Sequence, residues 1–323
     1  MRLIRGLNNL MSNVPQDFAG CVATIGNFDG LHLGHRRILE SLHASSEAHG
    51  LPTLVMMFEP QPKEFFAPDQ APARLANFRD KFQDLRDAGV DYLLCLPFNE
   101  ALRSMSAADF IQQILIEAIR VKHLIVGDDF RFGCDRSGDY AALERAGMEH
   151  GFTVTDTPTH EIGKKRVSST RVREELSRDN LARAAELLGR PYQMSGRVAY
   201  GRQLGRTLDT PTANVLIKRS RLPMNGVYAV HAIEQESGED YIGVANLGVK
   251  PTISGEPEPS LEVHLFGFSG DLYGQHLTVF FMQKIRDEMK FDGLDALKSA
   301  IDSDKQSARA YFASRPDSFR FDR

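Results

Sequence analysis

The sequence has few cysteines, no long apolar run and no large excess of charge of either sign. Its cysteines, Cys21, Cys95 and Cys134, are widely spaced and odd in number, and they lack metal-ligand spacing. This pattern argues against a disulfide scaffold and indicates a reducing compartment. The apolar runs are far too short to span a bilayer, and no apolar core follows Arg2 and Arg5, so no export signal is expected. We therefore expect a cytoplasmic protein without a membrane partner.

The charge balance argues against a further class of function. The net charge of −4 at pH 7 is unfavourable for nonspecific nucleic-acid binding, so no nucleic-acid partner is expected. The composition, 42% apolar and 25% charged, can form a buried core and differs from that of disordered chains. A length of 323 residues, without low-complexity segments or an obvious internal repeat, predicts about two domains. None of these properties indicates an oligomeric state.

The first half of the chain alternates between strand-like and helix-like patterns. Nearly continuous apolar runs predict buried parallel strands at Cys21–Ile25, Thr53–Phe58, Tyr92–Leu96 and His123–Val126. Helix-like stretches are Gly34–Ala48, Leu75–Ala88, Ala107–Arg120 and Tyr140–His150. This alternation predicts an open α/β sheet with ligands beyond the carboxyl ends of its strands.

After about Leu188 the pattern changes to short strands separated by turn residues. The predicted strands are Gly196–Tyr200, Gly226–Glu234, Tyr241–Asn246, Leu261–Phe266 and Leu277–Ile285. Their spacing predicts a small antiparallel barrel, covered by a final helix at Leu294–Phe312. A helix at Leu181–Leu188 ends at Gly189. We place the domain boundary near residue 186, giving domains 1–185 and 186–323.

A glycine-rich turn at Gly26–His35 joins the first buried strand to a helix. Strand, turn and helix aim free backbone N–H groups and the positive end of a helix dipole at an anion. His32 and His35 are three residues apart and share one face at the helix start. A helix cap with two surface histidines is the alternative, but glycines at both bends favour a phosphate site. The loop Gly127–Gly133 follows another strand and should lie at the same edge of the sheet.

The segment Lys164–Arg173 combines hydroxyls and arginines at a predicted helix start. Such groups can hold a polyphosphate, although an N-cap with a solvated basic face has the same composition. Together with the turn, the segment fits nucleotidyl transfer, in which a phosphate attacks the α-phosphorus of ATP and pyrophosphate leaves. We expect His32 and His35 near the α-phosphate. The residues expected near pyrophosphate are Ser169, Thr170, Arg171 and Arg173.

Two motifs of the second half also indicate phosphate chemistry. Gly201–Arg206 precedes Pro211–Asn214, and its glycines permit close approach to phosphates. The Thr212 and Asn214 oxygens are hard ligands suited to Mg²⁺, although this is also ordinary turn composition. In Leu261–Leu265, strand alternation places Glu262 opposite the apolar face. There it is a proton acceptor if its face looks into the barrel mouth, or a solvated surface residue if it faces water.

Together these stretches resemble the bacterial bifunctional riboflavin kinase/FMN adenylyltransferase family, also called FAD synthetases. The likeness extends roughly from Ala23 to Phe312. The matching stretches are Gly26–His35, Phe58–Pro62, Gly127–Gly133, Ser168–Arg173, Gly189–Tyr192, Pro211–Asn214, Asn246–Thr252, Leu261–Leu265 and Asp271–Gly274. His-x-Gly-His alone is shared across a superfamily, whereas this ordered set is highly specific.

The resemblance implies a nucleotidyltransferase-type, Rossmann-like first domain and a flavokinase-like barrel as the second. The barrel would phosphorylate riboflavin from ATP, and the first domain would adenylylate the resulting FMN to FAD, with ATP, riboflavin and FMN as small-molecule partners and Mg²⁺ as cofactor. Besides the catalytic His32 and His35, the implied ATP- and FMN-binding residues are Gly26, Asn27, Phe28, Asp29, Gly34, Asp129, Ser168, Ser169, Thr170, Arg171 and Arg173. In the kinase the implied ATP-binding residues are Gly201, Gly205, Arg206, Thr212 and Asn214, the last two also binding Mg²⁺, with Glu262 as general base.

One departure from the family pattern affects the kinase. Asp209-Thr210 stands where the family usually has Gly-Phe, directly before Pro211. A carboxylate about 5 Å from a triphosphate costs roughly 3 kcal/mol per like charge before screening at an effective dielectric near 20. A weakened kinase beside an intact adenylyltransferase is therefore an alternative. A flavin- or nucleotide-binding regulator without turnover is another, and the presence of a base such as Glu262 argues against it.

Overall fold

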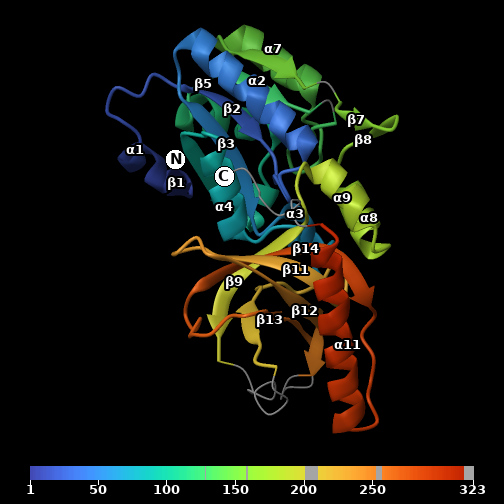
Figure 1. Ribbon diagram of the computed structural model, residues 1–323. Helices are drawn as coiled ribbons and strands as arrows, with labels where there is room; N and C mark the ends of the chain where they lie inside the picture. The colour runs from blue at the N-terminus through green and yellow to red at the C-terminus, as the bar shows by residue number, and fades with distance from the viewer. Residues whose placement is uncertain (128, 158, 201–209, 252–256, 316–323) are drawn as a thin grey trace. The chain divides into compact units, whose positions relative to one another are not determined.

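The computed structural model describes residues 1–127, 129–157, 159–200, 210–251 and 257–315 (Figure 1). The chain divides into two compact units. The first comprises Met1–Pro72 and Phe78–Ser168, and the second comprises Ala73–Asn77 and Ser169–Arg323. The five residues 73–77 therefore pack with the second unit although they lie within the sequence of the first.

The first unit contains a six-stranded parallel sheet with the order β1-β4-β3-β2-β5-β6. Its strands are β1 (Arg2–Arg5), β2 (Cys21–Ile25), β3 (Thr53–Glu59), β4 (Tyr92–Pro97), β5 (Val121–Val126) and β6 (Thr153–Asp156). Its longer helices are α2 (Leu33–His49), α4 (Phe78–Asp87), α7 (Tyr140–His150) and the π-helix η3 (Phe110–Ala118). Shorter elements are η1 (Leu7–Asn9), α1 (Leu10–Asn13), α3 (Pro62–Phe66), η2 (Pro68–Gln70), α5 (Glu100–Arg103), α6 (Ala107–Asp109) and the hairpin β7 (Glu161–Ile162) and β8 (Lys165–Arg166).

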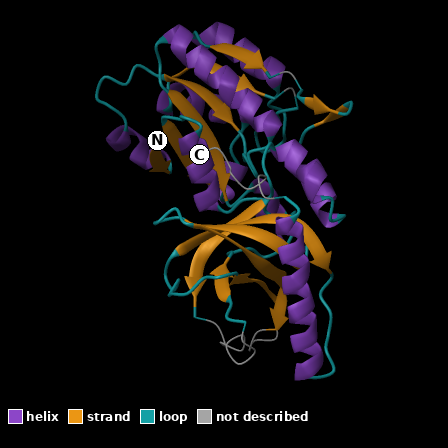
Figure 2. Cartoon of the chain, viewed as in Figure 1, coloured by secondary structure: helices purple, strands orange, loops and turns teal. Residues whose placement is uncertain are grey.

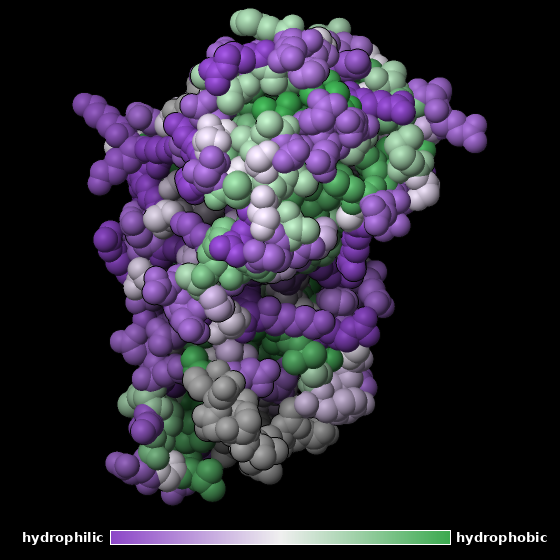
Figure 3. Space-filling view, turned by 180° about the vertical axis from the view of Figure 1, so that it is seen from behind, coloured by the Kyte–Doolittle hydropathy of each residue, from purple (hydrophilic) through white to green (hydrophobic). Residues whose placement is uncertain are grey.

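Apolar side chains cover both faces of this sheet. Figure 2 shows the helices that flank it. Leu39 and Leu42 of α2 join one core cluster, and Ile114 of η3 and Leu143 of α7 join the other. Every residue of β2 is buried, which agrees with its continuous apolar sequence. The visible surface in Figure 3 is mainly hydrophilic, with smaller hydrophobic areas between the charged side chains.

The second unit is a closed antiparallel barrel with the strand order β10-β13-β12-β11-β14-β9. Its strands are β9 (Gln193–Ala199), β10 (Ala213–Leu216), β11 (Gly226–Glu234), β12 (Asp240–Pro251), β13 (Pro257–Leu265) and β14 (His276–Arg286), and its helices are α8 (Ser169–Ser177), α9 (Leu181–Leu188) and α11 (Leu294–Ala313). Val227 and Val244 form a core cluster with Ala308 and Phe312, so α11 covers the outer side of β11 and β12. The predicted fold class, a parallel α/β sheet followed by a small barrel with a closing helix, is confirmed.

Some predicted elements differ from the observed ones. The helix predicted at Leu75–Ala88 begins only at Phe78, because residues 73–77 pack in the second unit. Most of the helix predicted at Ala107–Arg120 is the π-helix η3, a winding that the spacing of apolar residues did not distinguish from an α-helix. Strands β1, β6, β7, β8 and β10 were not predicted. None of the helices in the described part of the chain is long and apolar enough to cross a membrane.

Arg219 is the buried anchor of segment 73–77. Its guanidinium donates hydrogen bonds to the carbonyls of Arg74 and Leu75 and to the Tyr192 hydroxyl, the last at 2.9 Å. The Tyr192 hydroxyl in turn donates to the Leu75 carbonyl. Only 8% of Arg219 is exposed, so its planar donor group satisfies acceptors that water does not reach easily.

We expect Arg219→Met to destabilise the second unit by about 3 kcal/mol, because several buried acceptors lose a charged donor. Scanning calorimetry of the full chain should show a lower midpoint for the transition that includes the barrel. The control is Arg197→Met, an exposed arginine of β9, which should leave that midpoint nearly unchanged. Equal midpoints for the two variants would show that the Arg219 contacts contribute nothing.

Candidate active sites

The glycine-rich turn of the first unit lies between β2 and α2. His32 is the N-cap of α2, and its Nδ1 accepts a hydrogen bond from the backbone N–H of His35 at 3.2 Å. An accepting Nδ1 leaves the proton of the neutral ring on Nε2. The local structure therefore fixes both the orientation and the tautomer of His32.

The two imidazoles of the turn are stacked. The ring centroids of His32 and His35 are 3.7 Å apart with an interplanar angle of 14°, and the Phe28 ring lies 4.9 Å from that of His35. A Cβ at Gly34 would lie 3.2 Å from both the His32 ring and the Val167 carbonyl oxygen. Glycine at position 34 thus allows this tight arrangement.

The turn presents hydrogen-bonding atoms that are not used internally. Nδ1 of His35 and Oδ1 of Asn27 are buried and have no hydrogen-bond partner among the described residues. Burial, followed by the positive charges of His32, Lys81 and Arg166, holds the pKa of His35 well below its usual value, so the ring is neutral near pH 7. Unused polar atoms in a buried turn are suited to a ligand rather than to the fold alone.

The turn is also strained. Phe28 and Leu31 are non-glycine residues with φ values of 45° and 39°, and Gly30 between them has a φ of 85°. Left-handed conformations are uncommon for residues with large side chains, and they are concentrated at functional sites. Both side chains are buried, which holds this backbone in place.

A buried ion pair connects the turn to helix α4. Asp29 is 2% exposed, and its carboxylate lies 3.6 Å from the ammonium of Lys81, which is 1% exposed. Asp29 thus contacts another side chain of the unit, as a support for the turn. Sequence reasoning missed Lys81, although a lysine on the buried face of a predicted helix was a usable signal.

A second loop and a short hairpin bring opposite charges together. Arg166 on β8 donates two hydrogen bonds to Asp129, at 3.0 and 3.2 Å. Both side chains are exposed, so the pair is accessible to a ligand. Asp129 was predicted as a site residue, and its partner Arg166 was not.

An aromatic cluster lies where β3 and β4 end. The rings of Phe65, Phe66 and Phe98 are mutually in contact, with centroids 5.4 to 5.7 Å apart, and Phe58 lies 5.9 Å from Phe98. Phe66 is 60% exposed, which is unusual for a large apolar side chain. The strands β2, β3 and β4 are parallel neighbours, so this cluster and the turn after β2 share one edge of the sheet. The sequence signal was the pair of adjacent phenylalanines, which we did not use.

The segment that we predict to hold pyrophosphate crosses the boundary between the two compact units. Ser168 ends the first unit, whereas Ser169, Thr170, Arg171 and Arg173 lie on α8. The Nε of Arg173 donates to the Ala73 carbonyl at 2.6 Å. The proximity of these residues to pyrophosphate stays a prediction.

In the second unit, candidate residues align across three strands. Glu262 on β13 lies opposite Asn214 on β10 and opposite Asn246 on β12. The ammonium of Lys250 forms an ion pair with Glu262 and lies 3.5 Å from Oδ1 of Asn214. The His264 ring is hydrogen-bonded to the Pro211 carbonyl at 2.8 Å, which connects β13 to the start of the Pro211–Asn214 motif.

Alternation along β13 is confirmed. Leu261, Val263 and Leu265 are buried, while Glu262 and His264 lie on the opposite face. Glu262 lines a cavity of about 280 Å³ that is also lined by Leu297 and Ile301 of α11. The covering helix, which the alternation pattern did not reveal, creates this environment.

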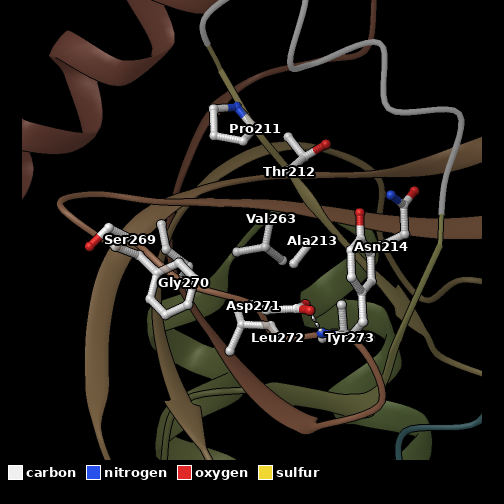
Figure 4. A pocket seen from close by; sticks show the side chains of 13 residues that line it. Pro211, Thr212, Ala213, Asn214, Val263, Ser269, Gly270, Asp271, Leu272 and Tyr273 are labelled. Carbon is white, nitrogen blue, oxygen red and sulfur yellow. Dashed lines mark hydrogen bonds between the residues drawn. The ribbon is translucent and has the colours of Figure 1, made fainter.

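A second cavity adjoins the first at Thr212. It has a volume of about 650 Å³ and is formed by the Pro211–Asn214 motif, Val198, Val263 and Leu265 of the barrel and the loop 268–273 (Figure 4). Thr212 lines both cavities, Asn214 lines the larger one and Glu262 the smaller one. In the loop, the Tyr273 backbone N–H donates to Asp271 at 2.8 Å, and the Tyr273 ring stacks on Tyr200.

Part of the predicted kinase site falls in a stretch that the structure does not describe. Gly201, Gly205, Arg206 and Asp209 lie outside the described residues. Thr210 is described and buried, and its hydroxyl accepts a hydrogen bond from Lys305 at 3.1 Å. Within the described ranges, no group of three or more histidine, cysteine, aspartate or glutamate side chains could hold a metal ion.

Comparisons with known proteins agree on both halves of the chain. The FAD synthetase family model matches residues 14–171, and the riboflavin kinase family model matches residues 188–312. The bifunctional riboflavin kinase/FMN adenylyltransferase of Pseudomonas fluorescens is 51% identical over 97% of this chain and 98% of its own length. The protein of the same name from Escherichia coli K12 is 50% identical with the same coverage.

One solved structure also covers nearly the whole chain. A Streptococcus pneumoniae protein described as a macrolide-efflux protein is 29% identical, with a TM-score of 0.79 over 96% of this chain and 99% of its own. Its fold therefore matches this one through both units.

Proposed function

The chain belongs to the bifunctional riboflavin kinase/FMN adenylyltransferase family, and on this premise we propose which of its residues carry out each reaction. It is an enzyme of FAD biosynthesis that phosphorylates riboflavin to FMN and adenylylates FMN to FAD. The observation that carries the assignment of residues is the position of Thr212. It lines both cavities of the barrel, with a carboxylate in one and a hard amide oxygen in the other.

We assign riboflavin to the smaller cavity and ATP to the larger one. The smaller cavity combines apolar walls with Glu262, which would accept the proton of the terminal ribityl hydroxyl as that oxygen attacks the γ-phosphorus. The bond from the γ-phosphorus to the bridging oxygen breaks, and ADP leaves from the larger cavity. Thr212, which borders both, would lie where the phosphoryl group passes between them.

The side chains of Thr212 and Asn214 fit a magnesium ion held mainly by ATP. Both offer neutral oxygen atoms of the hard kind that this ion prefers. Magnesium ions in phosphoryl transfer typically bridge phosphate oxygens with few protein ligands. When bound, the ion would neutralise charge that develops on the transferred group.

In the first unit we propose that the turn Gly26–His35 holds the α-phosphate of ATP. His35 and Asn27 offer unused polar atoms there, and His32 caps the start of the helix through its Nδ1. An FMN phosphate oxygen attacks the α-phosphorus, and the bond to the bridging oxygen of pyrophosphate breaks. Catalysis then depends on positioning and on donors at the developing oxyanion. Ser168, Ser169, Thr170, Arg171 and Arg173 are proposed to hold the leaving pyrophosphate. Asp129 is proposed to bind the substrates of the first unit, together with its partner Arg166.

The phenylalanine cluster, of which Phe66 is exposed, supplies a surface for the flavin ring of FMN. Phe65, Phe66 and Phe98 lie at the same sheet edge as the turn, and aromatic rings stack favourably on flat conjugated systems. This assignment also accounts for the exposure of the Phe66 side chain.

Three further assignments remain proposals. We keep the catalytic domains at 1–185 and 186–323, which bracket the two family matches. We propose a cytoplasmic location because all three cysteines are unpaired. A weakened kinase is the second candidate function, favoured by Asp209-Thr210, which stand where the family usually has Gly-Phe.

A single product assay tests these alternatives. We expect the purified enzyme, incubated with riboflavin, ATP and Mg²⁺, to form FMN first and FAD afterwards, as resolved by chromatography. Formation of FAD from supplied FMN without any FMN from riboflavin would support the weakened kinase. Absence of both products would support a regulator without turnover.

A further inference from the structure

Lys250 connects the two oxygen atoms on which the proposed kinase chemistry depends. From β12 its ammonium forms an ion pair with Glu262 and lies 3.5 Å from Oδ1 of Asn214. We propose that Lys250 is a positioning residue of the kinase step, which compensates the charge of Glu262 so that the ATP phosphates can approach that carboxylate. This inference rests on the proposed function of the barrel.

The strand register explains why position 250 can reach these atoms. Asn246 is directly opposite Glu262, and Lys250 lies four residues further along β12, on the same face of the strand. The intervening Gly248 leaves space between them, which the carboxylate of Glu288 occupies. A long side chain is therefore needed to extend from position 250 to Glu262 and across to Asn214 on β10.

Two other described cations of the barrel unit are already engaged. Arg286, which lines the smaller cavity, donates two hydrogen bonds to Asp304, at 2.9 and 2.8 Å. Lys305 of α11 forms an ion pair with Asp302 and donates to Thr210. Glu288, another carboxylate that lines the cavity, accepts a hydrogen bond from Asn246. Among the described residues, Lys250 is thus the cation that forms an ion pair with Glu262.

The chemistry of the reaction creates the need for this cation. A general base must lie beside the attacking hydroxyl, and the γ-phosphoryl group must reach the same oxygen. A free carboxylate would therefore be brought close to a polyphosphate, and like charges repel strongly at such separations. An ammonium between Glu262 and Asn214 lowers this repulsion before and during transfer.

The test compares Lys250→Met with Lys250→Arg in the full-length enzyme. Initial rates of FMN formation are measured with ATP and riboflavin varied in turn. We expect Lys250→Met to raise the KM for ATP about tenfold, with kcat and the KM for riboflavin changing less than about threefold, because the loss falls on binding of the phosphates. Lys250→Arg keeps the charge and should restore the KM for ATP.

Two controls separate this role from others. Lys298→Met removes an exposed lysine of α11 that lines neither cavity, and it should change neither KM. Conversion of supplied FMN to FAD monitors the first unit of the same protein. A wild-type enzyme that makes no FMN would overturn the proposed function itself, independently of Lys250.

The remaining outcomes contradict the inference while leaving the proposed function intact. An unchanged KM for ATP in Lys250→Met would make the contact an ordinary surface ion pair. A lower KM would mean that the ammonium competes with the nucleotide. Equal increases in both KM values, with a lower unfolding temperature, would show a structural role only.

Discussion

Glu262→Gln should reduce FMN formation by a factor of about 10² to 10⁴, the range typical for loss of a general base. Glutamine keeps the shape and polarity of the side chain, but it cannot accept the hydroxyl proton. The chain should still convert FMN to FAD, because Glu262 belongs to the barrel and the paired histidines belong to the first unit. The measurement is the rate of each product in separate assays, one started from riboflavin and one from FMN.

The matched control is Glu236→Gln, which changes an exposed glutamate in the turn between β11 and β12. It should leave both rates unchanged. If Glu262→Gln lost both activities while its thermal unfolding stayed normal, the idea of independent sites would be wrong. If it lost neither, Glu262 would be a binding residue at most, and another group would accept the proton.

The fold could be predicted from the sequence where local pattern and burial agree. Strand β2, helix α7 and strand β11 have the predicted bounds, because an uninterrupted apolar run or a regular helical face marks each of them. The strand β10 was missed because its four residues follow a motif rich in turn-forming residues. The helix at 75–88 was predicted too long because residues 73–77 pack in the second unit, where the Arg74 and Leu75 carbonyls accept hydrogen bonds from Arg219, more than 140 positions away.

In the candidate sites, too, local features could be predicted and contacts between distant segments could not. His32 and His35 could be paired from their spacing alone, since a helix start brings residues three apart together. Their stacking, the neutral state of His35 and the support of Asp29 by Lys81 depend on distant segments, which the sequence does not place. Glu262 could be assigned to the polar face of its strand. Its cavity could not, because α11 begins more than 30 residues later.

The contact of Lys250 with Glu262 arises from strand register in the same way. The two residues are 12 positions apart in the sequence, yet cross-strand pairing of β12 with β13 brings their side chains together. Register is set by the turns and by the alternation of buried side chains along both strands. A motif search compares residues along the chain and therefore does not detect such pairs.

His35→Ala should lower the rate of FAD formation from FMN by a factor of about 10² to 10³, as expected when one donor at a developing oxyanion is lost. His35→Gln should retain part of the activity, because burial holds the pKa of His35 low and the native ring acts as a neutral hydrogen-bonding group. FMN formation from riboflavin should be unaffected in both variants. Rates of the two steps, measured on the same preparations, provide the comparison.

The control is His150→Ala, at the end of α7, which removes an imidazole of the first unit that is not part of the turn. Because His35 also stacks on His32, calorimetry must show that the variants remain folded. Full FAD formation by a folded His35→Ala enzyme would mean that the turn serves the helix cap and not the nucleotide. If the glutamine and alanine variants lost equal activity, the His35 ring would have to carry a positive charge during the reaction, because glutamine cannot supply that charge.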